Sequence, residues 1–137
     1  MKTKLAQRVE RARAAAEFAA ILKRNKNGQP TVIQVPGHSG KRYEQFIRRN
    51  DHRKSGLTVE CQLETGFGHI LCPGNSNGTI CYHSIAAIEV VVKESGKKAS
   101  WCQTREIADL RARMGGQVIP VQSWKGTGIL YAVVEEA

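Results

Sequence analysis

The first part of the chain has the apolar spacing of an amphipathic helix. Leu5, Val9 and Ala12 recur at intervals of four and three residues, which places them on one helical face. The same stretch is rich in Ala, Glu, Arg and Lys, residue types that favour helix, and Gly28 follows as a candidate terminator. We therefore predict a helix over residues 2–25.

The middle of the chain alternates apolar and polar residues, which is the pattern of half-buried strands. Residues 57–64 alternate regularly, and after a Gly-rich turn at 65–68 the chain is predicted to return as a second strand at 69–72. Residues 31–35 form a shorter β-like run. Residues 41–49 fit either strand or helix; as a strand, they would place Tyr43, Gln45 and Ile47 on one face.

The second half of the chain predicts two helices and a hairpin. Residues 81–93 carry an apolar face after a turn-rich loop at 73–78. Ser100 and Gln103 form a capping box for a second helix, which Gly115 and Gly116 end. The apolar stripe expected on this second helix is Ile107, Leu110 and Met114.

The tail alternates again on both sides of residues 124–128, which predicts a closing hairpin with Pro120 on an edge strand. The fold class is therefore α+β. We expect a basic amphipathic helical arm at 1–28, followed by a single α+β domain at 29–137 with a C-terminal helix and β-hairpin. A length of 137 residues and a hydrophobic content of 41% suit one such domain.

The sequence carries no sign of a membrane or export segment. No apolar run approaches the roughly 20 residues that cross a bilayer. The basic N-terminus is not followed by the apolar stretch of a signal peptide. We expect a protein that is not secreted and that is cytoplasmic, or associated with a nucleoid or with viral replication.

Positive charge is confined to the first part of the chain. Residues 1–56 hold 14 Lys and Arg against 4 Asp and Glu, a net charge of +10, whereas residues 57–137 hold 7 against 8, a net charge of −1. Such a one-sided basic segment is typical of proteins that contact polyanions, chiefly nucleic acids, although a solvated, solubilising surface has the same composition. The candidates for phosphate contact are Arg8, Arg11, Arg13, Lys23, Arg24, Lys26, Lys41, Arg42, Arg48, Arg49, Arg53 and Lys54.

Three of the four cysteines are grouped with a histidine in a way that suits a metal. In the predicted hairpin, Cys61 lies opposite Cys72, and cross-strand partners project from one face about 4.5–5.5 Å apart. Cys81 and His83 follow after a loop that can curl back. Three thiolates and one imidazole make a closed tetrahedral zinc site, which stabilises a fold and leaves no position for substrate.

The second half of this cluster resembles the SWIM-type zinc finger, a hairpin followed by a helix with the pattern Cys-x-Cys, a variable loop, and Cys-x-His at the helix start. The matching residues are Cys72-Pro-Gly, a loop with Gly78, and Cys81-Tyr-His83. The resemblance covers about residues 43–93 and assigns Cys72, Cys81 and His83 as zinc ligands. It departs at Ile70, which stands where the family has its first cysteine.

The fourth ligand is therefore open between two residues. Cys61 is favoured by strand pairing, and His69 is the competitor, although its odd spacing from Cys72 sends it to the opposite face of a regular strand. Cys102 is expected to be an ordinary core cysteine. Two further readings of the cluster are a disulfide between Cys61 and Cys72, and unrelated buried cysteines beside a hydrogen-bonded histidine.

These features predict a non-catalytic accessory protein that binds one structural Zn²⁺ and contacts nucleic acid, DNA in preference to RNA, through phosphate rather than bases. The resemblance points the same way, since DNA or protein binding is proposed for SWIM-type modules. The chain lacks the His-x-Glu that deaminases place beside zinc, and it shows no recognisable catalytic motif. The alternative is a protein-interaction module or assembly subunit that uses the helix at 2–25, with zinc purely structural.

Overall fold

The computed structural model is a mixed α+β fold, as the sequence predicts, and it describes residues 3–37, 40–50, 53, 55–65, 68–72, 79–124 and 128–137. The elements in chain order are α1 (Lys4–Ala16), β1 (Ala20–Arg24), β2 (Pro30–Pro36), β3 (Arg42–Arg49), β4 (Leu57–Thr65), β5 (Gly68–Leu71), α3 (Tyr82–Glu94), β6 (Lys97–Cys102), α4 (Arg105–Ala112), β7 (Gln117–Ser123) and β8 (Ile129–Glu136). The predicted turn at Gly66-Phe67 and the predicted loop at 73–78 lie outside the described residues.

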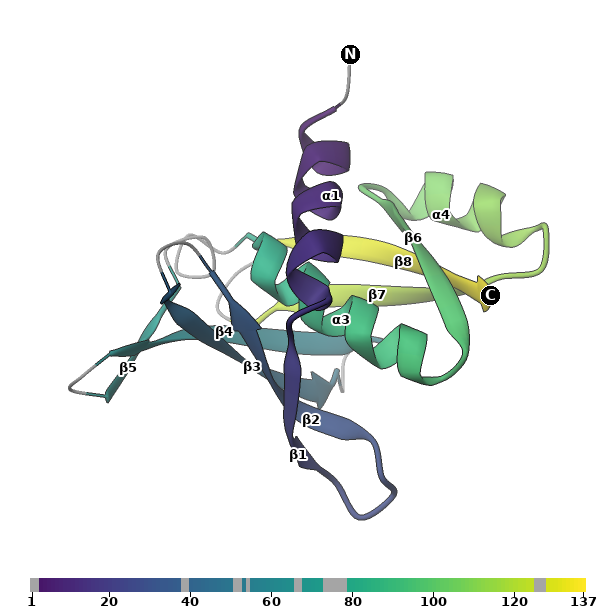
Figure 1. Ribbon diagram of the computed structural model, residues 1–137. Helices are drawn as coiled ribbons and strands as arrows, with labels where there is room; N and C mark the ends of the chain where they lie inside the picture. The colour runs from purple at the N-terminus through teal and green to yellow at the C-terminus, as the bar shows by residue number, and fades with distance from the viewer. Residues whose placement is uncertain are drawn as a thin grey trace.

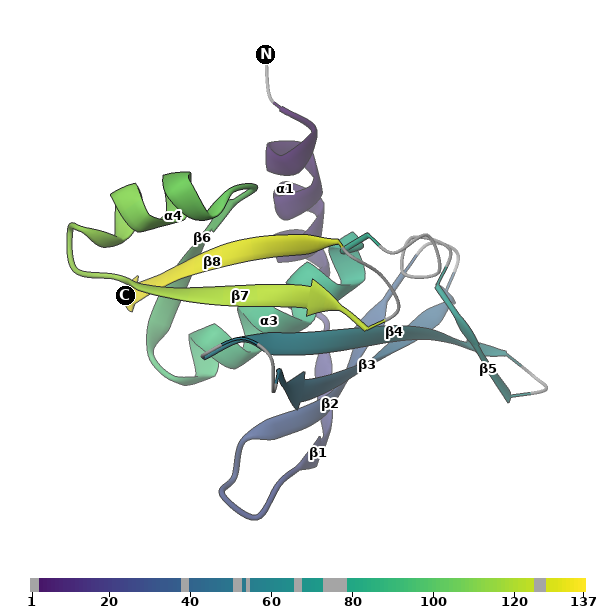
Figure 2. The ribbon, with the colours of Figure 1, turned by 180° about the vertical axis from the view of Figure 1, so that it is seen from behind.

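The strands form one curled sheet in the order β1-β2-β3-β4-β7-β8-β6, with β5 paired to β4 beside this path (Figure 1). Neighbouring strands are antiparallel except β4 and β7, which run parallel and pair only over residues 57–59 and 121–123. This short parallel contact joins the N-terminal strands to the C-terminal ones. Figure 2 shows the opposite side, where β4, β7 and β8 lie in front of α3.

The core lies between the sheet and two crossed helices. The strand residues that alternate toward α3 are fully buried, among them Ile33, Val35 and Val59. Helix α3 is enclosed by the sheet on one side and by α1 on the other, and Ile85, Ala86 and Ala87 are completely buried. This enclosure explains why its β-branched residues are tolerated, because packing outweighs their modest loss in helix propensity.

Several elements occur where the sequence predicts them. The β4–β5 hairpin has the expected register, with Glu64 opposite His69, and Gln62 is paired with Leu71. Helix α3 and the closing hairpin of β7 and β8 are also confirmed. The ambiguous segment at 41–49 is strand β3, and it does bury Tyr43 and Gln45 on one face.

The predicted helix at 2–25 is wrong in its second half. Helix α1 ends at Ala16, and residues 20–24 form strand β1, which pairs with β2. A helix running on to residue 25 would lose this pairing, in which Ile21 packs against the core opposite Ile33. Gly28 (φ +82°) serves the β1–β2 turn, where the Asn25 side chain accepts hydrogen bonds from two backbone N–H groups.

Helix α1 packs into the same core as the rest of the chain. Its apolar face, formed by Leu5, Val9 and Ala12, is buried and belongs to one cluster with residues of α3 and the sheet. Thr3 caps its start by accepting a hydrogen bond from the backbone N–H of Ala6 at 3.0 Å. The basic N-terminal segment is thus fixed to the domain by apolar contact.

Two predictions for the C-terminal half are wrong. Strand β6 extends past the predicted cap at Ser100 to Cys102, because residues 97–102 pair with β8. Helix α4 therefore begins at 105 and is capped by Thr104. Helix α4 packs through Ala108, whose small side chain allows close approach, while the predicted apolar stripe of Ile107, Leu110 and Met114 faces solvent.

Pro120 is also misplaced by the sequence prediction, since β7 is an interior strand between β4 and β8. Its missing N–H is tolerated because β7 pairs with β4 only from Val121 onward. Within the described residues, no helix is long and apolar enough to cross a membrane.

A matched pair of substitutions tests whether α1 is part of the core. Leu5→Ala should lower the free energy of unfolding by about 2–3 kcal/mol, because it leaves a cavity between α1 and α3. Leu110→Ala makes the same chemical change on the exposed side of α4 and should alter it by less than about 0.5 kcal/mol. Urea unfolding followed by circular dichroism measures both, and equal effects would contradict this packing.

Candidate metal centre

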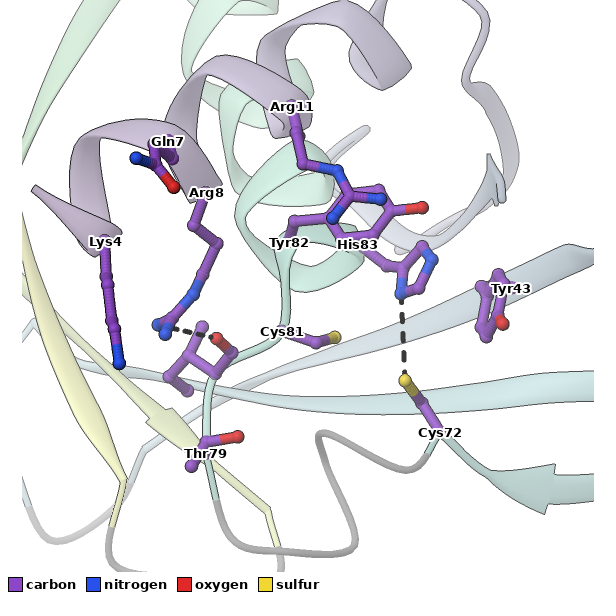
Figure 3. Close-up of a pocket in the computed structure, with 11 residues that line it drawn as sticks. Lys4, Gln7, Arg8, Arg11, Tyr43, Cys72, Thr79, Cys81, Tyr82 and His83 are labelled. Atoms are coloured by element: carbon purple, nitrogen blue, oxygen red, sulfur yellow. Dashed lines mark hydrogen bonds between the residues drawn. The ribbon is translucent and has the colours of Figure 1, made fainter. Parts of the chain in front are cut away.

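Four side chains from three segments converge at one end of the sheet. Cys61 comes from β4, Cys72 follows β5, and Cys81 and His83 lie at the start of α3. Their ligand atoms all lie within 4.8 Å of one another. We call these four residues the metal centre; Figure 3 shows three of them beside the pocket that they border.

The local folding of each segment explains this convergence. Alternation along β4 turns Cys61 toward the same buried side as Val59, and the backbone N–H of Cys72 donates to the Cys61 carbonyl at 2.9 Å. The hairpin register therefore brings both thiols to one face. Cys81 has extended backbone angles (φ −77°, ψ 164°) at the N-cap of α3, so the chain turns there and returns His83 toward the hairpin.

The donor set fits a tetrahedral metal ion. In a tetrahedral site with metal–sulfur bonds near 2.3 Å and metal–nitrogen bonds near 2.0 Å, ligand atoms lie roughly 3.3–3.8 Å apart. Nδ1 of His83 lies 3.7 Å from Sγ of Cys72, and the group as a whole spans at most 4.8 Å. Small side-chain adjustments would therefore close the four atoms around one ion, with Nδ1 as the nitrogen that faces Cys72.

A buried hydrogen-bond network supports the thiols. Gln45 is completely buried, and its Nε2 donates to Sγ of Cys61 at 3.0 Å. Its Oε1 accepts from Oγ of Ser84 at 2.9 Å, and that hydroxyl lies 3.4 Å from Sγ of Cys81. A donor such as the Gln45 amide orients its ligand and stabilises negative charge on a metal-bound sulfur. The amide of Gln45 thus links two of the thiols.

A column of stacked groups fixes the imidazole. The rings of Tyr43 and His83 stack with centroids 3.6 Å apart, and Tyr82 covers the histidine at 4.0 Å. The guanidinium of Arg11 lies 4.7 Å above the Tyr82 ring, in cation–π contact. Gly37 leaves room for this column, since a Cβ there would lie only 2.3 Å from the Tyr43 ring.

Burial favours the neutral form of the thiols when no ion is bound. Burial is the main cause that raises the pKa of Cys61, and its neighbours Cys72 and Cys81 add to the effect. The hydrogen bond with Cys61 lowers the pKa of Cys81, but the hydrogen bond with Cys72 and burial outweigh it and raise that pKa to about 11. A metal ion must therefore displace protons, and its binding weakens as the pH falls.

All four residues predicted as ligands lie together. The pairing across the hairpin that favours Cys61 agrees with the structure. The backbone register places His69 opposite Glu64, which is three positions from Cys61 along β4 and therefore on the other face of the strand. Cys102 is buried in a separate cluster with Ala108 and Val133, as expected of a core cysteine.

Sequence reasoning missed the supporting residues. Gln45 was detectable in part, because it is the polar member of a face shared with Tyr43 and Ile47. Ser84 and Gly37 gave no signal, since their contacts depend on how distant segments meet.

The predicted phosphate-contact residues do not form one patch. Arg8 and Arg11 lie on α1 beside the metal centre, and Lys41 and Arg42 directly precede Tyr43, which borders it. Most others lie around the β1–β2 turn and the far end of β3: Lys23, Arg24, Lys26, Arg48, Arg49 and Arg53. Lys54 lies outside the described residues.

Several of these arginines make contacts within the protein. Arg13 donates to Glu89 at 3.0 Å and to the Ala99 carbonyl at 2.7 Å, which ties α1 to α3 and β6. Arg24 forms a two-bond ion pair with the exposed Glu94, which raises the pKa of Arg24 and lowers that of Glu94. Arg13 and Arg24 therefore already bind groups of the protein itself, whether or not they also contact a phosphate.

Comparison with known proteins adds no relative: no family model, no curated protein and no solved structure matches the chain. The resemblance to SWIM-type zinc fingers consequently stays a prediction.

Substitution of single cysteines tests the metal centre. The wild-type protein should hold close to one equivalent of a thiolate-preferring metal ion, and Cys61→Ser should lose most of it because one of four ligands is removed. Cys102→Ser removes an equally buried thiol outside the centre and should retain the ion. Metal analysis of the purified proteins measures this, and equal metal content in both variants would contradict the assignment.

A second pair of variants tests the hydrogen bond to Cys61. Gln45→Leu should weaken metal binding by roughly 10–100-fold, since it removes the amide that donates to the sulfur. Gln62→Leu, next to Cys61 on β4 but on the opposite face, should leave binding near the wild-type value. Competition with a chromophoric chelator gives both affinities; unchanged affinity for Gln45→Leu would remove the supporting role.

Proposed function

We propose that the metal centre binds one zinc ion and that the protein is a non-catalytic accessory protein that binds nucleic acid through its phosphate backbone. Three thiolates and an imidazole are ligands that Zn²⁺ prefers. With all four positions supplied by the protein, the ion holds no exchangeable water and stabilises the fold. Its role is to join the β4–β5 hairpin to the start of α3.

The segregation of charge carries the nucleic-acid proposal. A net charge of +10 over residues 1–56 and −1 over the remainder gives a protein with one strongly basic segment. The positive electrostatic potential of such a segment attracts polyanions and raises the rate at which they associate with the protein. Contacts of Lys and Arg to phosphate release counterions and bind any sequence, so weak sequence preference is expected.

The packing of α1 favours nucleic-acid binding over the alternative, in which this helix docks onto a protein. The apolar face that such docking needs is already occupied, because Leu5, Val9 and Ala12 are buried in the protein's own core. The side of α1 left outside is polar and basic, with Lys4 and Arg11 exposed. That side suits an anionic ligand better than an apolar one.

Salt dependence of binding tests the proposal. Affinity for a labelled single-stranded DNA of about ten nucleotides, measured by fluorescence anisotropy, should fall with salt with a log–log slope of roughly −3, as four or more phosphate contacts require. Two unrelated sequences should bind within a few-fold of one another. A slope near zero, or the absence of binding to DNA and RNA at low salt, would overturn the proposal.

Matched charge variants locate the contact. The two triple variants are Lys23→Gln, Lys41→Gln and Arg49→Gln in the basic segment, and, as the control, Lys93→Gln, Lys98→Gln and Arg113→Gln in the remainder. The first should reduce the slope by roughly 0.7, the share of one phosphate contact on a single strand, and the control should leave it nearly unchanged. Equal reductions would show that net charge alone, and not the basic segment, governs binding.

A further inference from the structure

A pocket between α1 and the start of α3 gathers positive charge directly over the metal centre. It has a volume of about 510 Å³, within the usual range of ligand sites. One wall is the polar side of α1, and the floor is the segment 79–83, which carries Cys81 and His83. Among the described residues that line it, three are cationic and none is acidic.

The three cations come from one face of α1. Lys4, Arg8 and Arg11 follow the helical spacing of four and three residues, and Figure 3 shows their side chains extending from α1 toward the 79–83 segment. Three positive charges line one concavity and none of the described lining residues is acidic, so the pocket favours an anionic ligand.

Two of these cations are held in place by the floor of the pocket. Nη1 of Arg8 donates to the carbonyl of Ile80 at 3.2 Å. A guanidinium carries five N–H donors, so Arg8 can keep this bond and still donate to an anion. Arg11 is positioned over the Tyr82 ring. Both guanidinium groups are therefore oriented before any ligand arrives, which reduces the entropic cost of binding.

The aromatic rings of the pocket are already stacked on one another. Tyr82 contacts both Arg11 and His83, and His83 in turn is stacked on Tyr43. The stacked faces of these rings are not available to a nucleobase, which is the usual role of aromatic side chains in single-strand binding. The ligand group that matches the pocket is thus a phosphate rather than a base.

We propose that this pocket, formed by Lys4, Arg8 and Arg11 over the 79–83 segment, is the principal phosphate-binding site for a nucleic-acid strand. The proposal rests on the nucleic-acid-binding function proposed above and assigns that function to a particular site. Because Cys81 and His83 fix the floor, the metal centre sets the geometry of the site. Each basic residue at the β1–β2 turn then contributes less to the affinity for the strand than each cation of the pocket does.

A charge-reversal pair tests this site with little risk to folding. Lys4→Glu places a carboxylate in the first turn of α1, where a negative charge interacts favourably with the helix dipole, so the variant should fold at least as stably as wild type. It should weaken binding of a labelled oligothymidine by about tenfold. Lys26→Glu, an equal charge change at the exposed β1–β2 turn, should weaken it by no more than about threefold.

The outcomes separate this proposal from the function on which it rests. If the wild type binds the strand and both variants lose affinity equally, the pocket is not the principal site, although nucleic-acid binding stands. If the wild type binds no nucleic acid, both proposals fail. Arg11→Gln provides a second variant inside the pocket and should also weaken binding more than Lys26→Glu does. Circular dichroism and thermal unfolding confirm that each variant is folded.

Competition distinguishes a nucleic-acid backbone from a small phosphate compound. Pyrophosphate should displace the labelled oligonucleotide only at concentrations well above those at which the oligonucleotide binds, because a strand adds contacts outside the pocket. Tighter binding of pyrophosphate than of the oligonucleotide would overturn the assignment of a strand as the ligand.

Discussion

The antiparallel pairing of β4 with β5 is the constraint on which the rest of this structure depends. The pairing places Cys61 and Cys72 on one face of a hairpin, and only in that register do their sulfurs meet the Cys81 sulfur and the His83 imidazole at the start of α3. A slip by one residue would turn one thiol to the opposite face of the sheet. Helix α3 in turn packs on the sheet, and α1 lies against α3.

The metal centre and the basic helix belong to one packed unit. A series of contacts runs from Arg11 on α1 through Tyr82 and His83 to Tyr43 on β3, so a residue of the metal centre is linked by side-chain contacts to a surface cation. Gln45 on β3 donates a hydrogen bond to the sulfur of Cys61, which links the sheet to the metal centre. A change in the position of His83 would therefore be transmitted to the charged surface through direct contacts, over a distance of only a few side chains.

Local patterns predicted the elements whose environment is local. The alternation in β4, the hairpin register and the apolar residues of α3 were readable because each of these segments buries the side that its own pattern indicates. The errors at residues 17–25 and 100–104 have the opposite origin: strand partners elsewhere in the chain overrode good local helix signals. The four residues of the metal centre were predictable as a group because cysteine and histidine have few common roles. Its supporting shell was not, because glutamine, serine and glycine have many.

The short parallel contact between β4 and β7 has a consequence for the order in which the protein assembles. It pairs residues 57–59 with residues 121–123, whereas all four members of the metal centre lie between positions 61 and 83. During synthesis the hairpin and the start of α3 are complete well before β7 emerges from the ribosome. All four residues of the metal centre are therefore present in the nascent chain while the β4 edge still awaits its partner, so this part of the fold can form before the C-terminal strands close the sheet.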